Sequence, residues 1–272
     1  MNMELIVTLI IPIAISGILS GIIAGLFGVG GGIILVPAIV ITLEFLDYSP
    51  SITMHLAIAT SLAIIVPTAI SSSFGHHKKG VIDYEIIRRL YLTIIIGSIL
   101  GGIMAQRIPG DGLRLIFGLT AAFSSINMMR KNQFTIGKSM PKNNLVNSSI
   151  GFSIGSISSM IGIGGGAFFV PLLNGFSVSH HKATGTAAFL GLVIAIPGTI
   201  VFSFADTHLL SFPPWSFGMI SLPIFLIFVP LTIIGAQFGV IIAHKLDGLL
   251  LRRLFSIFLF LMAIRMIIVA VY

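Results

Sequence analysis

The sequence predicts an all-α polytopic membrane protein made of two inverted repeats, each with a glycine-broken helical hairpin and about three further transmembrane helices. Composition is the first observation behind this prediction. Hydrophobic residues make up 56% of the 272 residues, charged residues only 8%, and the mean hydropathy is +1.11. A soluble domain carries about 25% charged residues, so a soluble fold is excluded. Long apolar runs without alternation favour helices over barrel strands.

Apolar segments are the second observation. A helix needs about 20 apolar residues to cross the hydrocarbon layer, and most segments reach that length. The first is interpreted as a membrane segment, because it lacks the basic start and cleavage site of a signal peptide. The segments for which we expect helices cover 5–26, 33–46, 52–74, 90–106, 112–129, 145–161, 167–177, 183–204, 216–242 and 249–271. Two of them, 33–46 and 167–177, are short.

Each short segment directly follows a glycine cluster, "GVGGG" at 28–32 and "GIGGG" at 162–166. Glycine weakens a helix, and irregular backbone at membrane depth must be buried or line a polar cavity. The first N–H groups of the short helices that follow lack intrahelical partners and carry the positive end of the helix dipole. Such an N-terminus is an anion site. The alternative, that the glycines only allow close helix packing, stays open.

Internal repetition is the third observation. "GLFGVGGGIILVP" (25–37) matches "SMIGIGGGAFFVP" (159–171), and "GSILGGIMAQRI" (97–108) matches "GAQFGVIIAHKL" (235–246). We expect a first repeat at 1–130, a cytoplasmic linker at 131–144 and a second repeat at 145–272, forming one integrated membrane domain. Five segments in each half would turn the second repeat upside down, as in many secondary transporters, whose substrate lies near the midplane between the repeats.

Basic residues test the topology, because they gather on the cytoplasmic side. If every segment reverses the chain, only Arg107 and Arg114 fall on one side. The other side collects Lys78, Lys79, Arg88, Arg89, Arg130, Lys131, Lys138, Lys142, Lys182, Lys245, Arg252 and Arg253. This asymmetry predicts a multi-pass protein of the inner, cytoplasmic membrane with both termini on the non-cytoplasmic side.

The expected substrate site combines the two glycine clusters with hydroxyls of the following helices. Thr60 and Ser61 in "IATS" correspond to Thr186 in "TGTA", and their hydroxyls can donate to an oxyanion. The alternative for such residues is a bond back to a carbonyl of their own helix. The predicted substrate-binding residues are Gly28, Gly30, Gly31, Gly32, Thr60, Ser61, Gly162, Gly164, Gly165, Gly166, Gly185 and Thr186.

Further candidates could contact the anion or carry a coupling proton or cation. His55 and His181 are paired across the repeats, with an interfacial position as the alternative. Arg265 is a costly charge within a helix unless it reaches the surface, and it aligns with Asn127. Gln237 is a similar candidate of lower weight. The sequence predicts no cofactor, no metal site, no nucleic-acid partner and no catalytic residues; a homodimer stays open.

These motifs resemble the sulfite exporter TauE/SafE family over nearly the whole chain. The resemblance is carried by "GLFGVGGGIILVP", "GIGGGAFFVP", "IATS", "TGTAA" and the run from "IIGAQFGVIIAHKL" to "MAIRMI". It implies a transporter of sulfur-containing anions such as sulfite and organosulfonates, although related members could handle other small organic anions.

Secondary transport of a small sulfur oxyanion or organosulfonate is therefore the expected function, with export and alternating access at the two glycine-loop helix N-termini. A carboxylate transporter is one alternative. An anion channel is another, but two antiparallel glycine copies do not supply the repeated filter of a channel. An intramembrane enzyme would need a nucleophile with a base or clustered metal ligands, which the sequence does not show.

Overall fold

The computed structural model describes residues 3–129, 136–141, 143–206, 213–243 and 248–271. These residues form ten helices and one small hairpin, which confirms the predicted all-α membrane fold. Part of the predicted linker, residues 131–135 and 142, lies outside this description. The helices are α1 (Met3–Phe27), α2 (Gly32–Phe45), α3 (Pro50–Lys78), α4 (Tyr84–Ala105), α5 (Gly110–Met129), α6 (Asn144–Ile161), α7 (Gly166–Gly175), α8 (His180–Ser203), α9 (Leu222–Ala243) and α10 (Gly248–Val271).

The helices break at both glycine clusters, as the sequence predicts. The first glycine loop, residues 28–31, separates α1 from α2, and the second glycine loop, residues 162–165, separates α6 from α7. Gly31 and Gly165 are the residues immediately before α2 and α7, and their φ angles are 77° and 74°. Only glycine adopts this left-handed conformation without steric cost, so the sequence fixes the two sharp entries into the short helices.

The predicted helix over 216–242 begins later than expected. Residues Ser216–Phe217 (β1) and Ile220–Ser221 (β2) pair as an antiparallel hairpin, and α9 starts at Leu222. Trp215 and Gly218 have φ angles of 64° and 57°, which a helix does not allow. The apolar composition of residues 216–221 is typical of a membrane helix, but the chain reverses its direction here and forms the hairpin instead.

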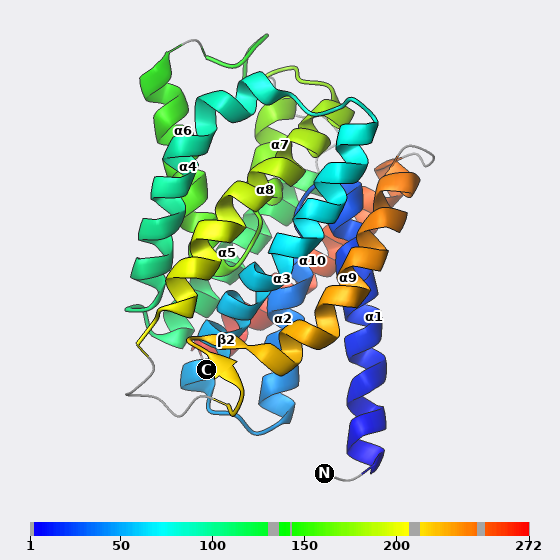
Figure 1. Cartoon of the computed structure of the whole chain (residues 1–272), viewed down its shortest axis with the longest axis vertical. Helices are drawn as coiled ribbons and strands as arrows, with labels where there is room; N and C mark the ends of the chain where they lie inside the picture. The colour runs from blue at the N-terminus through cyan, green and yellow to red at the C-terminus, as the bar shows by residue number, and fades with distance from the viewer. Residues whose placement is uncertain (1–2, 130–135, 142, 207–212, 244–247, 272) are drawn as a thin grey trace.

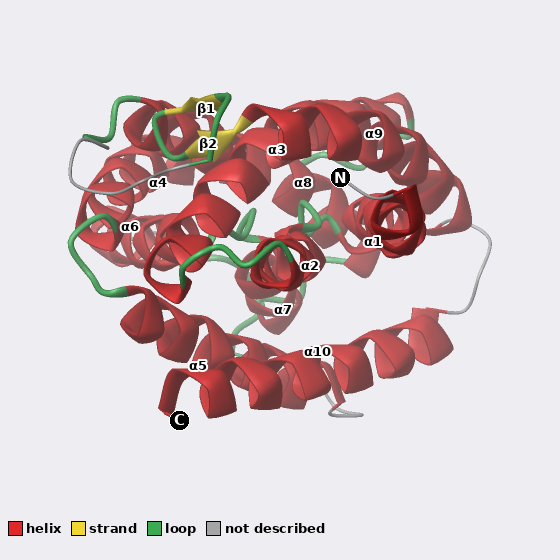
Figure 2. Ribbon diagram, turned by 90° about the horizontal axis from the view of Figure 1, so that it is seen from below, coloured by secondary structure: helices red, strands yellow, loops and turns green. Residues whose placement is uncertain are grey.

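The helices pack in layers. In Figure 1, α1 begins and α10 ends toward the lower end of the bundle, and α2 runs down while α7 lies near the top. Figure 2 shows α5 and α10 as one layer, with α2 and α7 between this layer and the remaining helices. The most extensive helix contacts are α4 with α6, α1 with α9, α5 with α10, and α3 with α8.

Small residues allow two of these pairs to approach backbone to backbone. A Cβ atom on Gly21 or Gly25 of α1 would overlap carbonyl oxygens of α9, and one on Gly97 or Gly101 of α4 would overlap those of α6. Close contact between glycine stripes is a common way to pack membrane helices, where lipid gives no hydrophobic drive.

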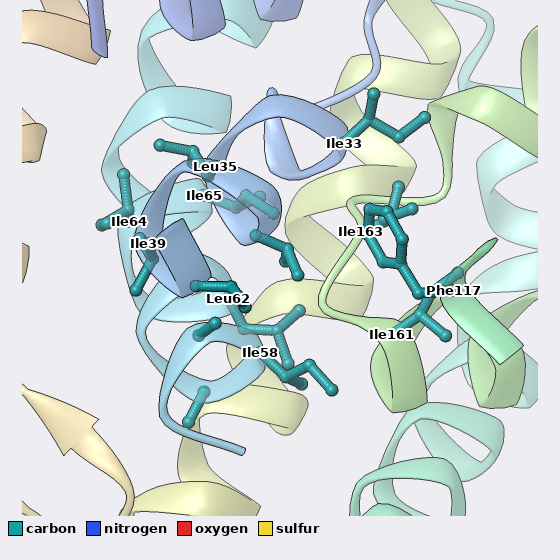
Figure 3. Close-up of a cluster of buried hydrophobic side chains, with 14 of the residues drawn as sticks. Ile33, Leu35, Ile39, Ile58, Leu62, Ile64, Ile65, Phe117, Ile161 and Ile163 are labelled. Atoms are coloured by element: carbon teal, nitrogen blue, oxygen red, sulfur yellow. The ribbon is translucent and has the colours of Figure 1, made fainter. Parts of the chain in front are cut away.

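The core surrounds the short helices. Ile33, Leu35 and Ile39 of α2 pack in one buried cluster with Ile58 and Leu62 of α3, together with side chains of α5 and of the second glycine loop (Figure 3). Among the described residues, five helices are long and apolar enough to cross a membrane: α3, α4, α5, α8 and α9. Large apolar side chains such as Phe123 and Leu226 remain exposed, as expected for a surface that faces lipid.

Candidate functional site

The two glycine loops touch each other at the centre of the molecule. A Cβ atom on Gly32 would overlap the carbonyl oxygen of Gly162, and one on Gly166 would overlap the carbonyl oxygen of Gly28. Between these contacts, a Cβ atom on Gly30 would lie 3.2 Å from the Cα atom of Gly164. The glycines therefore both break the helices and allow close packing, so the two interpretations of the sequence describe one arrangement.

Both short helices start with N–H groups that the protein leaves without partners. The carbonyl of Gly31 accepts from the N–H groups of Ile34 and Leu35, and Gly165 does the same for the second helix. Among the hydrogen bonds of the described residues, none is donated by the N–H groups of Gly32, Ile33, Gly166 or Ala167. Because these residues are buried, this is an unusual set of open donors at the positive ends of two helix dipoles.

Two serine hydroxyls support the glycine loops. Ser61 on α3 donates to the carbonyl of Gly162 at 2.9 Å, and Ser20 on α1 donates to the carbonyl of Gly31 at 3.0 Å. Neither serine bonds back to its own helix. The Ser61 hydroxyl proton is thus used within the protein, where the sequence suggested a donor to the anion.

Thr60 and Thr186 hold the helix that follows in the opposite half of the chain. Thr60 Oγ1 accepts from the N–H of Ser221, just before α9, at 3.0 Å. Thr186 Oγ1 accepts from the N–H of Asp83, just before α4, at 2.9 Å. Both threonines are fully buried. The expected pairing of these two positions is visible in the structure, but their partners are backbone groups of the protein.

Two cavities border the short helices. The α2 cavity, about 320 Å³, lies between α1, α2 and α10, and it extends along α2 from Ile34 to Phe45. The α7 cavity, about 30 Å³, is bounded by α7, the end of α5 and the first glycine loop. Gly166 and Asn127, two predicted site residues, both line the α7 cavity. Its volume suits a single water molecule.

Other predicted residues lie apart from the glycine loops. His55 is buried, with Nδ1 3.2 Å from the Ser51 carbonyl oxygen and Nε2 3.0 Å from that of Ile108. His181 is exposed beside His180. Exposed Gln237 donates to Ser71 on α3. A Cβ atom on Gly185 would meet Val81 and His76, so this glycine accommodates the turn before α4.

A charge cluster around the buried side chain of Arg114 joins three helices, and the sequence predicts only part of it. Glu44 at the end of α2 pairs with Arg265 of α10 at 2.9 Å and with Arg114 of α5 at 3.1 Å. Arg114 is 2% exposed and also contacts Asp111 at 3.0 Å and Thr53 at 2.8 Å. Arg265 therefore has a carboxylate partner, and snorkelling to the surface is not needed to explain it.

Comparison with known proteins agrees with the fold. The family described as "Sulfite exporter TauE/SafE" matches residues 13–266. A "Probable membrane transporter protein" of Haemophilus influenzae is 32% identical, with 89% of this chain and 91% of the relative covered. The "Probable membrane transporter protein YunE" of Bacillus subtilis is 23% identical over the same shares, and "Probable membrane transporter protein MJ0441" of Methanocaldococcus jannaschii is 25% identical over 98% of both chains. No solved structure matches the chain.

The match covers both glycine loops and both halves of the bundle, and the curated relatives share a single description as membrane transporters. The apolar exterior and the five long apolar helices fit that description. The chain is therefore a multi-pass membrane transporter that belongs to the sulfite exporter TauE/SafE family.

Proposed function

We propose that this transporter moves a small anion, in the leading case a sulfur oxyanion such as sulfite or an organosulfonate, outward across the cytoplasmic membrane. The anion binds where the N-termini of α2 and α7 meet. The observation that carries the proposal is the set of four buried N–H groups without partners at Gly32, Ile33, Gly166 and Ala167. Helix N-termini of this kind bind anions through their N–H groups and their dipoles.

The contacts between helices support an inverted repeat. α1 packs on α9 as α6 packs on α4, and Thr60 holds Ser221 as Thr186 holds Asp83. Each contact joins one half of the chain to the other. For each there is an equivalent contact in which the first half takes the place of the second and the second that of the first. A two-fold relation between the repeats would place its axis near Gly30 and Gly164, where the loops touch. Transporters with this architecture bind their substrates near the midplane, at the broken helices.

The unequal cavities support alternating access. The α2 cavity reaches Ile34 in the first turn of α2, and the α7 cavity reaches Gly166 in the first turn of α7. The two short helices run toward opposite ends of the bundle (Figure 1). One route to the glycine loops is wide and the other nearly closed. We infer that during transport the α2 cavity closes while the α7 cavity opens, and the reverse, so that the anion reaches the loops from one side at a time.

Basic residues support the orientation. The end of α3 and the starts of α4 and α8 lie at the upper end of Figure 1 and carry Lys78, Lys79, Arg88, Arg89 and Lys182. The lower end carries Arg107 and Arg114 and the described ends of α1 and α10. By the positive-inside rule, the upper end faces the cytoplasm and both termini face away from it.

Cysteine accessibility tests the proposal, because the chain has no cysteine of its own. Ala38→Cys reports on the α2 cavity and Asn174→Cys on the α7 cavity, while Ser49→Cys in an exposed turn is the matched control. Each variant is labelled with a membrane-impermeant maleimide from the side its cavity faces, with and without saturating methanesulfonate. We expect the anion to change the two cavity rates in opposite directions and to leave Ser49→Cys unchanged. Parallel changes at both cavities, or none, would contradict alternating access.

A further inference from the structure

We propose that the α2 cavity, together with Arg265 about one helical turn beyond its lining, is a binding site for a monoanion that carries an apolar chain. The acid group would pair with Arg265 in place of Glu44, and the alkyl chain would lie in the cavity. This inference rests on the proposed anion transport, and within the proposed class of sulfur oxyanions and organosulfonates it selects organic anions that carry an apolar chain.

The volume and lining of the cavity support an apolar occupant. A cavity of about 320 Å³ is within the range of small-molecule sites, whereas an anion of four heavy atoms needs roughly 120 Å³, taking about 30 Å³ for each water-sized group. The walls include Pro37, Ile41 and Met262. Its two hydroxyls, Ser16 and Thr42, donate to carbonyls of their own helices, at 3.1 and 2.8 Å.

The Glu44–Arg265 ion pair follows the lining residues Ile41 and Met262 by about one helical turn on α2 and α10. On α2, Pro37 and Ile41 line the cavity, and Glu44 continues the same helical stripe at i, i+4 and i+7. On α10, Phe258 and Met262 line it, and Arg265 follows at the same spacing. The 2.9 Å contact between Glu44 and Arg265 therefore lies about one turn beyond Ile41 and Met262, toward the carboxyl-terminal end of α2.

The charges at this position would allow the acid group of the ligand to replace Glu44 as the partner of Arg265. Arg265 and Glu44 are 35% and 27% exposed, so an acid group can reach the guanidinium. Behind them lies Arg114, which is 2% exposed and whose Nε has no hydrogen-bond partner among the described residues. Two guanidinium groups thus share Glu44, and the other nearby carboxylate, Asp111, is 65% exposed. The Glu44 and Asp111 carboxylates thus leave one donor of the buried Arg114 guanidinium without a partner.

Chain-length dependence tests this site. The protein is placed in lipid nanodiscs and titrated with alkanesulfonates from methane- to octanesulfonate, which stay ionised throughout. Burying one methylene is expected to tighten Kd by about fourfold, until the chain fills the cavity. Met262→Trp, which fills the cavity, should remove the chain-length dependence, while Leu261→Trp on the exposed side of α10 should keep it. Arg265→Gln should weaken binding of every chain length by at least about tenfold, and Arg253→Gln should not.

The outcomes separate this inference from transport itself. A Kd that does not change with chain length, or that Met262→Trp leaves unchanged, would overturn the amphiphilic site even if sulfite flux is normal. Binding that appears only with the longest chains would indicate a lipid site and would also overturn it. Conversely, absence of all anion flux would refute the proposed function, whereas a chain-length dependence that requires Met262 and Arg265 would still establish the site.

Discussion

The hydroxyl oxygen of Thr60 accepts a hydrogen bond from the backbone N–H of Ser221 at 3.0 Å, which ties α3 in the first half of the chain to the start of α9 in the second. The equivalent bond, from Asp83 to Thr186, ties α8 to the start of α4. These two bonds between the halves of the chain hold the long helices around the glycine loops. We therefore expect them to affect the stability of the fold as well as the binding of an anion.

Replacing Thr60 with valine leaves the shape nearly unchanged but removes the acceptor. The buried N–H of Ser221 then lacks a partner, which costs about 1–3 kcal/mol. We expect a lower melting temperature for Thr60→Val, a similar loss for Thr186→Val, and near-normal behaviour for Thr60→Ser. Thermal unfolding in detergent, followed by light scattering, measures these melting temperatures. If Thr60→Val weakened anion affinity with no loss of stability, the hydroxyl would instead contact the substrate.

Gly166→Ala should prevent native packing of the loops. The added Cβ atom overlaps the backbone of Gly28 and Val29, which cannot move aside like a flexible side chain. Gly80→Ala is the matched control, because its surroundings are open although its φ is 65°, and the cost there is limited to about 1–2 kcal/mol. Size-exclusion profiles of the purified variants should show a monodisperse protein for Gly80→Ala alone. Native profiles for both would contradict the loop contact.

The charge cluster gives a third prediction. Glu44→Gln leaves buried Arg114 with Asp111 alone as counter-charge, and because Glu44 is 27% exposed the loss should be smaller than the about 3–5 kcal/mol typical of a fully buried pair. The double variant Glu44→Gln with Arg114→Met should lose less stability than the sum of the losses in Glu44→Gln and Arg114→Met, while Arg265 loses its partner equally in the single Glu44 variant and in the double variant. A double-mutant comparison of melting temperatures checks this. Equal, additive losses would show that the pair is not coupled.

His55 gives a fourth prediction. Both ring nitrogens face carbonyl oxygens, those of Ser51 and Ile108, so the neutral ring can donate to one of them and the protonated ring to both. His55→Leu removes every such bond and should lower the melting temperature, with the turn before α5 exchanging its amide hydrogens faster. Exposed His181→Leu is the control. Unchanged stability with a lost pH dependence of flux would restore the proton-coupling role for His55.

The sequence predicts the ten helices and the two breaks because these follow from local features. Apolar length defines a membrane helix, and four glycines in five residues end one wherever they occur. The repeated motifs predict that Thr60 and Thr186 correspond, and the two residues make equivalent hydrogen bonds. Their partners could not be predicted, because Ser221 and Asp83 are more than 100 residues away and meet the threonines only through helix packing.

The charge cluster was missed for a related reason. Glu44 lies at a segment end, where a carboxylate is usually solvated. Arg114 lies near the start of the segment 112–129, where it is interpreted only as one of the basic residues that test the topology. A signal was present: Arg265 within an apolar helix needs a partner, and Glu44 is among the few carboxylates near apolar segments. The hairpin of β1 and β2 was also missed, since its apolar residues resemble the helix that follows.

Flux through the purified protein in proteoliposomes tests the central claim most directly. Uptake is measured for sulfite, sulfate, thiosulfate, taurine and short carboxylates, with and without a pH gradient, and with Gly31→Leu and Gly165→Leu as site variants. We expect saturable flux of a sulfur-containing anion that depends on the gradient and is lost in both variants while membrane insertion is retained. Normal flux in both glycine variants, or flux of carboxylates with none of any sulfur anion, would contradict it.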